Sequence, residues 1–211
     1  MISRKIGTAM QMKQKYHVFE MKWSRIHHRH RKIGQPNNMN FEQEGIYSPI
    51  IEITRKTEKS ENFFRLIAQK LLSIVVVQIP DISLNISVDS LTLFLNFLRD
   101  SVCLSVEEGI IAIALLQRFA HKQQEKGIYI LNTKNVGTLL VVLAIVTMKM
   151  NRDCAHRNSS IGRMFNIPVS ILNESEMAFL NQIDHEALVE EDTFSLLLEE
   201  ILHIQAIGIQ L

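Results

Sequence analysis

The sequence is poor in the residues that build disulfide-rich, turn-rich and low-complexity proteins. Its 211 residues include only 2 cysteines, 4 prolines and 8 glycines. Cys103 and Cys154 are too few for a disulfide framework and too far apart in sequence for a CxxC pair, so we expect a reducing compartment. The scarcity of glycine and proline argues against all-β folds with many turns and against low-complexity linkers.

No apolar stretch of the sequence is long enough to cross a membrane. The longest run without a charged residue, residues 135–148, has 14 residues, whereas a transmembrane helix needs about 20. The first 15 residues are polar and basic and contain no apolar segment of the kind found in secretion signals. We therefore expect an intracellular protein, in the nucleus, the cytoplasm or both, without a membrane among its partners.

Sequence motifs of common catalytic and cofactor sites are also missing. No two glycines have the spacing of GxGxxG or GxxxxGK[ST], the loops that hold phosphates. The run Asp-His-Glu at 184–186 has no partnered nucleophile and fits the end of a helix better. The histidines within residues 27–30 lack the spacing of a zinc site on a helix. We predict a binding protein rather than an enzyme, with no catalytic residues, no cofactor and no metal.

Charge divides the chain into two parts. Residues 1–34 carry nine lysines and arginines against a single acid, Glu20, which gives a net charge of +8, while the remaining 177 residues carry −7. Residues 1–60 show no sustained apolar period, so we predict a basic and mostly disordered N-terminal arm. The overall composition, with 46% hydrophobic and 21% charged residues, supplies a sizeable core for the remainder.

From residue 61 onward the sequence has the pattern of a helical domain. Apolar residues recur three and four positions apart, as on the buried face of a helix. Ser105 followed by Glu108 has the spacing of a capping box. We predict a helical domain over 61–205 and a C-terminal tail over 206–211. The expected helices cover about residues 62–79, 87–98, 106–119, 134–150, 160–165, 168–183 and 194–204.

One segment of the predicted domain is apolar on every side. Residues 139–146 read Leu-Leu-Val-Val-Leu-Ala-Ile-Val, and alone such a run also fits a buried strand. The segment extends from about residue 132 to 150 without proline and has Lys149 near its end, which favours a helix. A helix that is hydrophobic all round must be surrounded by protein. The sequence therefore predicts an all-α fold around a buried central helix.

The order of these segments resembles a cyclin box. The similar segments are 86–91 at the start of the family's first box helix, 107–119 for the second helix, 133–149 for the third helix with its terminal lysine, and 165–180 for the family's "L-N-x-L-E" segment. The chain looks like a divergent member of the single-box P/U-type class related to the fungal phosphate-regulation cyclins. The resemblance implies an all-α, cyclin-box-like five-helix bundle with a buried central helix and flanking N- and C-terminal helices.

The resemblance also implies a partner and a site. Lys149 and Glu176 match the lysine and glutamate with which cyclins contact backbone near the movable C-helix of a cyclin-dependent protein kinase, and Met150 and Leu180 would flank the pair as apolar contacts. The implied function is a regulatory subunit that forms a heterodimer with such a kinase and activates it, as cell-cycle cyclins do. The residues alone also fit a simpler interpretation, in which Lys149 is a helix-end cation and Glu176 an ordinary exposed residue.

The sequence departs from the family pattern at several places, among them Gly137-Thr138, which stand where the family's third helix has His-Arg. Phe97 and Gln117 stand where the family has a buried arginine–aspartate pair, and the Met-Arg-Ala-Ile-Leu substrate-docking sequence is not present. Losing both members of such a pair is consistent, because one member left alone costs about 3–5 kcal/mol. The alternative function is a cyclin-fold, transcription-factor-like module that binds DNA or polymerase through the basic arm; other nucleic-acid binding is expected only non-specifically, through residues 1–34.

Overall fold

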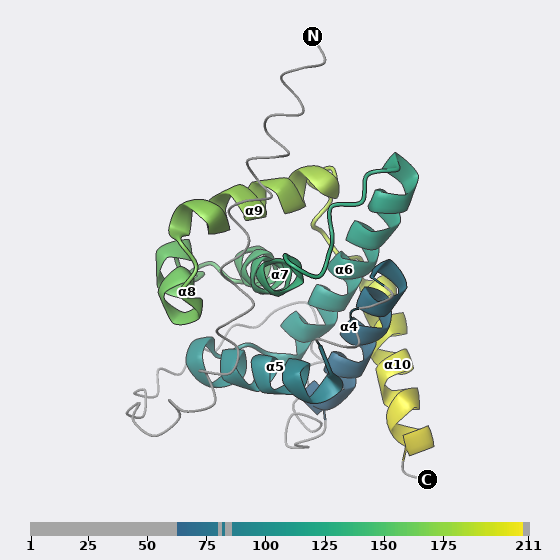
Figure 1. Ribbon diagram of the computed structural model, residues 1–211. Helices are drawn as coiled ribbons and strands as arrows, with labels where there is room; N and C mark the ends of the chain where they lie inside the picture. The colour runs from purple at the N-terminus through teal and green to yellow at the C-terminus, as the bar shows by residue number, and fades with distance from the viewer. Residues whose placement is uncertain (1–62, 80–81, 83–85, 209–211) are drawn as a thin grey trace. The chain divides into compact units, whose positions relative to one another are not determined.

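The structure is a computed structural model that describes residues 63–79, 82 and 86–208, with side chains described up to residue 203. All of these residues belong to one compact unit, Ile51–Leu211. The described residues form seven α-helices and no β-strand, which confirms the all-α prediction (Figure 1). The helices are α4 Phe63–Gln78, α5 Val88–Val102, α6 Val106–Lys126, α7 Val136–Asn151, α8 Asn158–Phe165, α9 Val169–Gln182 and α10 Glu191–Gly208.

The predicted end of the arm and the predicted end of the domain can be compared with the ranges that the structure describes. The predicted arm, 1–60, lies outside the described residues, as do residues 209–211 of the predicted tail. Helix α10 continues to Gly208 and so runs past the predicted domain end at residue 205. None of the helices that the structure describes combines the length and the apolar character needed to span a bilayer.

The first turns of α5 and α6 are closed by serine capping boxes. The Ser105 hydroxyl accepts from the Glu108 N–H at 3.2 Å, and the Glu108 carboxylate accepts from the Ser105 N–H at 2.9 Å. Ser87 and Ser90 make the same reciprocal pair at the start of α5. Each box satisfies backbone donors that the first turn of a helix leaves without partners. The Ser105 box predicted from the sequence is confirmed.

Helix α7 is the buried centre of the unit. Every residue from Val136 to Met148 except Leu139 is buried, and α7 packs against both α6 and α9. Figure 1 shows α7 end-on, with α9 above it, α5 below it and α6 to its right. The buried hydroxyl of Thr147 donates to the Leu143 carbonyl at 2.8 Å, so its polarity is satisfied within the helix. The prediction of a buried central helix is therefore confirmed.

The two outermost helices cover one side of α6. Helix α4 packs on α5 and α6, and α10 packs on α6 and α4. Helix α4 contributes buried apolar side chains such as Ile67 and Leu71, and α10 contributes Phe194 and Ile201. These contacts give α6 a buried environment along most of its length, as its apolar centre requires.

Helix α6 is longer than the sequence predicted. The apolar period ends near Phe119, but the helix continues to Lys126, where Gly127 caps it with a left-handed φ of 61°. The additional residues are mostly polar, yet Gln123 is only 1% exposed. A polar segment can extend a helix when its side chains bind nearby backbone groups. Here these side chains bind the loop that follows α6 and the end of α9.

Candidate functional site

The structure brings Lys149 and Glu176 together. Lys149 lies in the last turn of α7 and Glu176 near the middle of α9, 27 residues further along the chain. The Lys149 ammonium donates to both carboxylate oxygens of Glu176, at 2.7 Å and 2.9 Å. The Lys149 side chain is 38% exposed and that of Glu176 is 13% exposed. The ion pair therefore opens to solvent on the lysine side and is supported by protein on the glutamate side.

Asn158, the first residue of α8, fixes the orientation of the glutamate. Its side-chain amide donates to Glu176 Oε2 at 2.6 Å and to the Asn173 side-chain oxygen at 2.8 Å. Three helices, α7, α8 and α9, thus supply the groups around one carboxylate. A carboxylate held by two donors from different helices has little freedom to rotate, so the pair is formed before any partner arrives. Asn158 was not predicted from the sequence.

Apolar side chains, several of them exposed, occur on the two helices that carry this ion pair. Of the two that were predicted, Met150 is 50% exposed and Leu180 is partly buried. The structure adds Met177 and Val169, which are 52% and 45% exposed. Val169 and Met177 lie eight residues apart on α9, about two helical turns, and therefore share a face. That spacing is the signal that would have identified them from the sequence. We call the six residues Lys149, Met150, Val169, Glu176, Met177 and Leu180 the α7–α9 surface.

A second ion pair, not predicted, holds the C-terminal end of α7. Arg152 follows α7 directly, and its guanidinium donates to both oxygens of Glu108, each at 2.5 Å. It also donates to the carbonyls of Val102 and Cys103 at 2.9 Å. Arg152 therefore joins the end of α7 to the corner between α5 and α6, which places Lys149 and Met150. The Phe97 ring packs edge-on against Phe165, with the ring centroids 5.4 Å apart.

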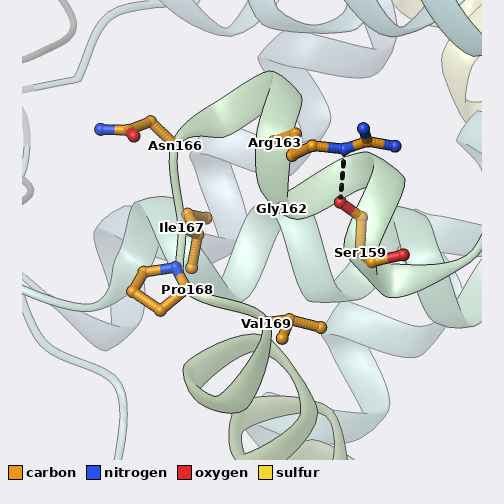
Figure 2. A pocket seen from close by; sticks show the side chains of 7 residues that line it. All are labelled: Ser159, Gly162, Arg163, Asn166, Ile167, Pro168 and Val169. Atoms are coloured by element: carbon orange, nitrogen blue, oxygen red, sulfur yellow. Dashed lines mark hydrogen bonds between the residues drawn. The ribbon is translucent and has the colours of Figure 1, made fainter.

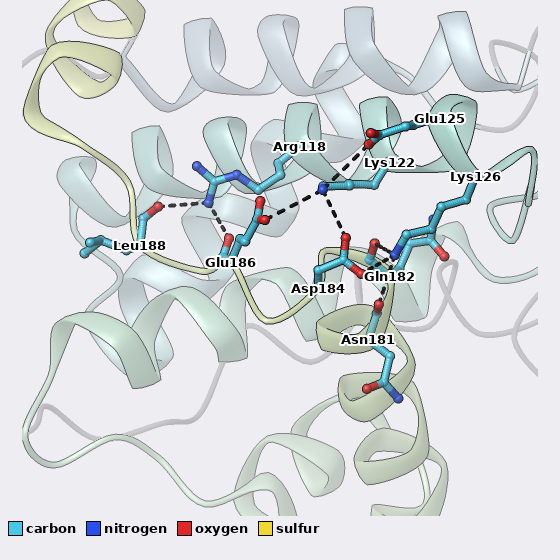
Figure 3. A network of polar contacts seen from close by, with 9 residues as sticks. All are labelled: Arg118, Lys122, Glu125, Lys126, Asn181, Gln182, Asp184, Glu186 and Leu188. Atoms are coloured by element: carbon cyan, nitrogen blue, oxygen red, sulfur yellow. Dashed lines mark hydrogen bonds and ion pairs between the residues drawn. The ribbon is translucent and has the colours of Figure 1, made fainter.

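Basic side chains of α6 bind the C-terminal end of α9 and the loop that follows it (Figure 3). Arg118 donates to the carbonyls of Glu186 and Leu188. Lys126 donates to the Gln182 carbonyl at 2.8 Å and to Asp184 Oδ1 at 2.6 Å. These bonds take up backbone carbonyls that the end of a helix and its following loop leave without partners. They hold α9, and with it Glu176, against α6.

The Asp-His-Glu run at 184–186 takes part in this contact between α6 and the end of α9. Helix α9 ends at Gln182, and Asp184 and His185 have left-handed φ angles of 55° and 59°. Lys122 lies 3.0 Å from Asp184 Oδ2 and 3.7 Å from Glu186 Oε1. The prediction that this run marks a helix end is confirmed, and its carboxylates serve as partners for the lysines of α6.

The interactions of Lys122 and Lys126 with Asp184 shift two pKa values in opposite directions. The hydrogen bond from Lys126 lowers the pKa of Asp184 below its ordinary value of 3.8, and the bond from Lys122 lowers it further. The bond to Asp184 raises the pKa of Lys122 above 10.5, with smaller contributions from Glu125 and Glu186. Each shift favours the charged form of its group. The folded state therefore gains from Asp184 above pH 3.8 and from Lys122 below pH 10.5.

We expect the stability contributed by Asp184 to disappear in acid. Asp184→Asn removes the charge, and asparagine tolerates the left-handed backbone at this position. Near pH 7 the variant should unfold at a lower urea concentration than the wild type. Because the folded-state pKa of Asp184 is lowered, the difference should shrink as the pH falls below 3.8 through that pKa. Urea unfolding of both proteins from pH 7 to about pH 3 measures it.

Glu174→Gln is the control for this pH series. Glu174 is exposed on α9 and has no ion-pair partner among the described residues, so the variant should match the wild type at every pH. A difference between wild type and Asp184→Asn that stays constant down to pH 3 would contradict the assignment.

A shallow pocket lies at the junction of α8 and α9, close to the α7–α9 surface (Figure 2). It is lined by Ser159, Gly162, Arg163, Asn166, Ile167, Pro168 and Val169. Gly162 lies within α8, and a Cβ there would lie 2.7 Å from the Ile167 carbonyl oxygen, so glycine lets the turn after α8 pack against this helix. Arg163 is the one ionisable residue in the lining, and its Nε donates to the Ser159 carbonyl at 3.3 Å. The pocket offers no acid–base pair of its own.

Within the described part of the chain, no group of three or more histidine, cysteine, aspartate or glutamate side chains is placed to hold a metal ion. The histidines within residues 27–30 lie outside it. Cys103 and Cys154 are free and exposed. The chemistry that the described surface does offer is an oriented ion pair with apolar neighbours, a combination suited to binding protein.

Comparisons of the chain with protein-family models, with curated proteins and with solved structures found no match.

Proposed function

We propose that this protein is a regulatory subunit of a cyclin-dependent protein kinase and that it binds the kinase through the α7–α9 surface. The observation that carries the proposal is the Lys149–Glu176 ion pair, with its N–O distances of 2.7 Å and 2.9 Å. The resemblance paired these two residues from positions 27 apart in the sequence.

The arrangement of helices supports the same proposal. The resemblance implies a five-helix box with a buried central helix, and the segments that carry it correspond to α5–α9. The third of these, α7, is the buried one. Helices α4 and α10 lie outside the five, as the flanking N- and C-terminal helices of the proposed cyclin-box bundle.

The ion pair has hydrogen-bonding capacity left for a partner's backbone. A lysine ammonium has three donors, and Lys149 gives two of them to Glu176. A carboxylate can accept about four hydrogen bonds, and the Glu176 oxygens accept two from Lys149 and one from Asn158. One donor and about one acceptor site remain, side by side and partly exposed. They match one C=O and one N–H of a partner's main chain.

Exposed apolar side chains next to the pair would supply most of the buried area. Met150 and Met177 are each about half exposed, and methionine adapts its shape to an irregular partner surface. Polar groups at the centre of such a surface fix the register, while the apolar groups contribute the favourable free energy of burial. The α7–α9 surface has both.

Binding of this kind activates a kinase by selecting one of its conformations. Phosphoryl transfer requires the kinase C-helix to bring its glutamate to the β3 lysine. A rigid surface that binds only the inward C-helix shifts the equilibrium toward that state by its differential affinity. The bonds from Asn158, Arg152 and Lys126 hold α7, α8 and α9 in place, which supplies the required rigidity.

We expect Glu176→Lys to weaken kinase binding by at least about 30-fold, because it replaces an attractive pair with two like charges at the centre of the surface. The measurement is pull-down and titration of the full chain against a panel of recombinant cyclin-dependent kinases, with kinase activity toward a peptide as the second readout. Near-ultraviolet circular dichroism and urea unfolding establish that the variant is folded.

Glu174→Lys is the matched control for this experiment. It introduces the same charge change on the same helix, two residues away, at a side chain that is exposed and has no ion-pair partner among the described residues. The control should bind like the wild type. A folded Glu176→Lys variant that binds a kinase as tightly as Glu174→Lys would refute the interface.

The alternative, a module that binds DNA or polymerase through its basic arm, stays a prediction. Residues 1–34 lie outside the described residues, so no structural observation favours it.

A further inference from the structure

Three consecutive apolar residues are exposed in the loop between α6 and α7. Ile128, Tyr129 and Ile130 are 53%, 69% and 37% exposed. Single exposed apolar side chains are common on protein surfaces, but contiguous ones mark interaction sites. We call residues 128–130 the IYI tip.

The first and third residues of the IYI tip are bonded to a buried glutamine. Gln123 of α6 is 1% exposed, and its backbone carbonyl accepts from the Ile128 N–H at 3.1 Å. Its side-chain oxygen accepts from the Ile130 N–H at 2.6 Å and from the Leu131 N–H at 2.9 Å. One residue of α6 therefore fixes the loop on both sides of Tyr129.

Two asparagines that follow the tip hold its third residue as well. The side-chain amides of Asn132 and Asn135 both donate to the Ile130 carbonyl, at 3.1 Å and 2.8 Å. Both backbone groups of Ile130 and the N–H of Ile128 are thus used within the chain. Fixing a loop before binding removes part of the entropy cost of association.

Tyr129 differs from its two neighbours because neither of its backbone groups is used. Its N–H and its C=O have no hydrogen-bond partner among the described residues. In a β-ladder, the backbone groups of one residue bond to one side and those of the next residue to the other. The tip lies outside any helix and has no left-handed φ. Its bonds follow the pattern of an edge strand, used inward at Ile128 and Ile130 and unused at Tyr129.

The charges around the tip cancel, so they select neither an anionic nor a cationic partner. Residues 122–134, with the two acids beyond α9 that lysines of α6 contact, contain three lysines and three acids: Lys122, Lys126 and Lys134, and Glu125, Asp184 and Glu186. Two copies of a surface without net charge can approach each other without the repulsion that a surface of one sign would meet.

The IYI tip is separate from the α7–α9 surface. The tip precedes α7, whereas Lys149 and Met150 lie in its last turn. A helix of 16 residues is about 24 Å long, so the two surfaces lie at opposite ends of α7. Figure 1 shows the C-terminal end of α6, from which the tip continues, at the periphery of the helical unit. A contact at the tip therefore leaves the α7–α9 surface free.

We propose that the IYI tip is a self-association site, at which two copies of this chain pair antiparallel across a two-fold axis. With Tyr129 on the axis, the N–H of each copy donates to the Tyr129 carbonyl of the other, so the unused groups satisfy each other. Ile128 of one copy then lies opposite Ile130 of the other, at positions where antiparallel side chains come closest. The backbone bonds fix the register and the apolar side chains supply the burial.

The size of the tip predicts a reversible association. Val77, at the end of α4, adds a side chain that is 71% exposed, and the neighbouring Gln78 accepts from Gln123 at 3.4 Å. Even so, the surface is smaller than that of a permanent dimer, which engages about 20–30 residues on each side. Sedimentation equilibrium of the full chain, from micromolar to millimolar concentration, should show a monomer that converts to a dimer.

The first test compares Tyr129→Pro with Tyr129→Ala. Both remove the ring, but only proline removes the N–H, and both should fold because that N–H has no partner within the described chain. Each of the two central bonds of the dimer uses one such N–H. Tyr129→Pro should therefore self-associate at least about tenfold more weakly than Tyr129→Ala. Near-ultraviolet circular dichroism and urea unfolding establish that both are folded.

The second test checks the register by mixing copies that carry different tags. An antiparallel pair centred on Tyr129 places position 128 of one copy opposite position 130 of the other. Ile128→Glu and Ile130→Lys should each lose self-association alone, because each places an unpaired charge against isoleucine. Mixed together they should form heterodimers, because one contact becomes a carboxylate–ammonium pair and the other remains isoleucine against isoleucine. Capture through one tag and detection of the other measures this.

The control mixture is Ile128→Glu with Ile128→Lys. It contains the same two charges, but in the proposed register the substituted positions are diagonal neighbours, about 7–8 Å apart, and do not lie opposite each other. The control should form heterodimers at least about tenfold more weakly than the mixture of Ile128→Glu with Ile130→Lys.

Four outcomes would overturn the proposal. The first is a full chain that stays monomeric up to millimolar concentration, and the second is a Tyr129→Pro variant that associates as tightly as Tyr129→Ala. The third is a control mixture that pairs as well as Ile128→Glu with Ile130→Lys. The fourth is loss of kinase binding in Ile128→Glu while the wild type is monomeric, which would make the tip a docking site for another protein. Self-association is independent of the Glu176→Lys result, so the two proposals can fail separately.

Discussion

Replacing Arg152 with methionine is expected to lower the free energy of unfolding by about 3 kcal/mol or more. Methionine retains much of the aliphatic length but removes the guanidinium that binds both oxygens of Glu108. Glu108 is only 3% exposed, so its carboxylate would remain buried without a counter-charge. The carbonyls of Val102 and Cys103 would lose a donor as well. Urea unfolding near pH 7 measures the loss.

Two variants separate this effect from a general effect of mutation. Arg157→Met changes an exposed arginine on the connection that follows α7, one without an ion pair among the described residues, and should stay within about 0.5 kcal/mol of wild type. The double variant Glu108→Gln/Arg152→Met should be more stable than Arg152→Met alone, since no charge is left unpaired. Equal losses for Arg152→Met and Arg157→Met would show that Glu108 gains nothing from its partner.

The parts of the fold that sequence could predict depend on local chemistry. A serine and a glutamate three residues apart satisfy each other's backbone donors whatever surrounds them, which is why the start of α6 at Val106 was predictable. A run that is apolar on every side has to be buried, so the position of α7 followed from residues 139–146. Both inferences require only neighbours along the chain.

Other features depend on contacts that no local pattern encodes. The continuation of α6 to Lys126 rests on bonds from Lys126 to Gln182 and Asp184, more than 50 residues away. Arg152 looked like one basic residue among many, although its partner Glu108 lies 44 residues earlier. Lysine and arginine side chains are long and have many possible partners, so their pairing is decided by the packing of the helices that carry them.

The candidate site was predicted only in part. The pairing of Lys149 with Glu176 came from the resemblance, because the residues by themselves favoured a helix-end cation and an ordinary exposed acid. The structure places them in contact, while the kinase role remains a proposal. Asn158, which orients the glutamate, was missed because its amide acts across the gap between α8 and α9. A side chain that positions another carries no sequence signal of its own.

Phe179→Ala is expected to lower the free energy of unfolding by about 3–5 kcal/mol. Phe179 lies on α9 and is 1% exposed, and its ring stacks on Phe119 of α6 with centroids 5.3 Å apart and planes inclined by 5°. Alanine would leave a cavity between the two helices and remove this aromatic contact. Urea unfolding measures the loss, and Phe179→Leu, which keeps most of the volume, should lose clearly less.

The consequence for function follows from the position of this stack. Phe179 is three residues from Glu176 on the same helix, so the stack and the bonds of Lys126 together fix the depth at which α9 presents its carboxylate. If kinase binding depends on that depth, Phe179→Ala should bind more weakly than Phe179→Leu even where both are fully folded. Equal affinities of the two folded variants would mean that α9 keeps its place without the stack, and that Lys149 and Asn158 are sufficient to orient Glu176.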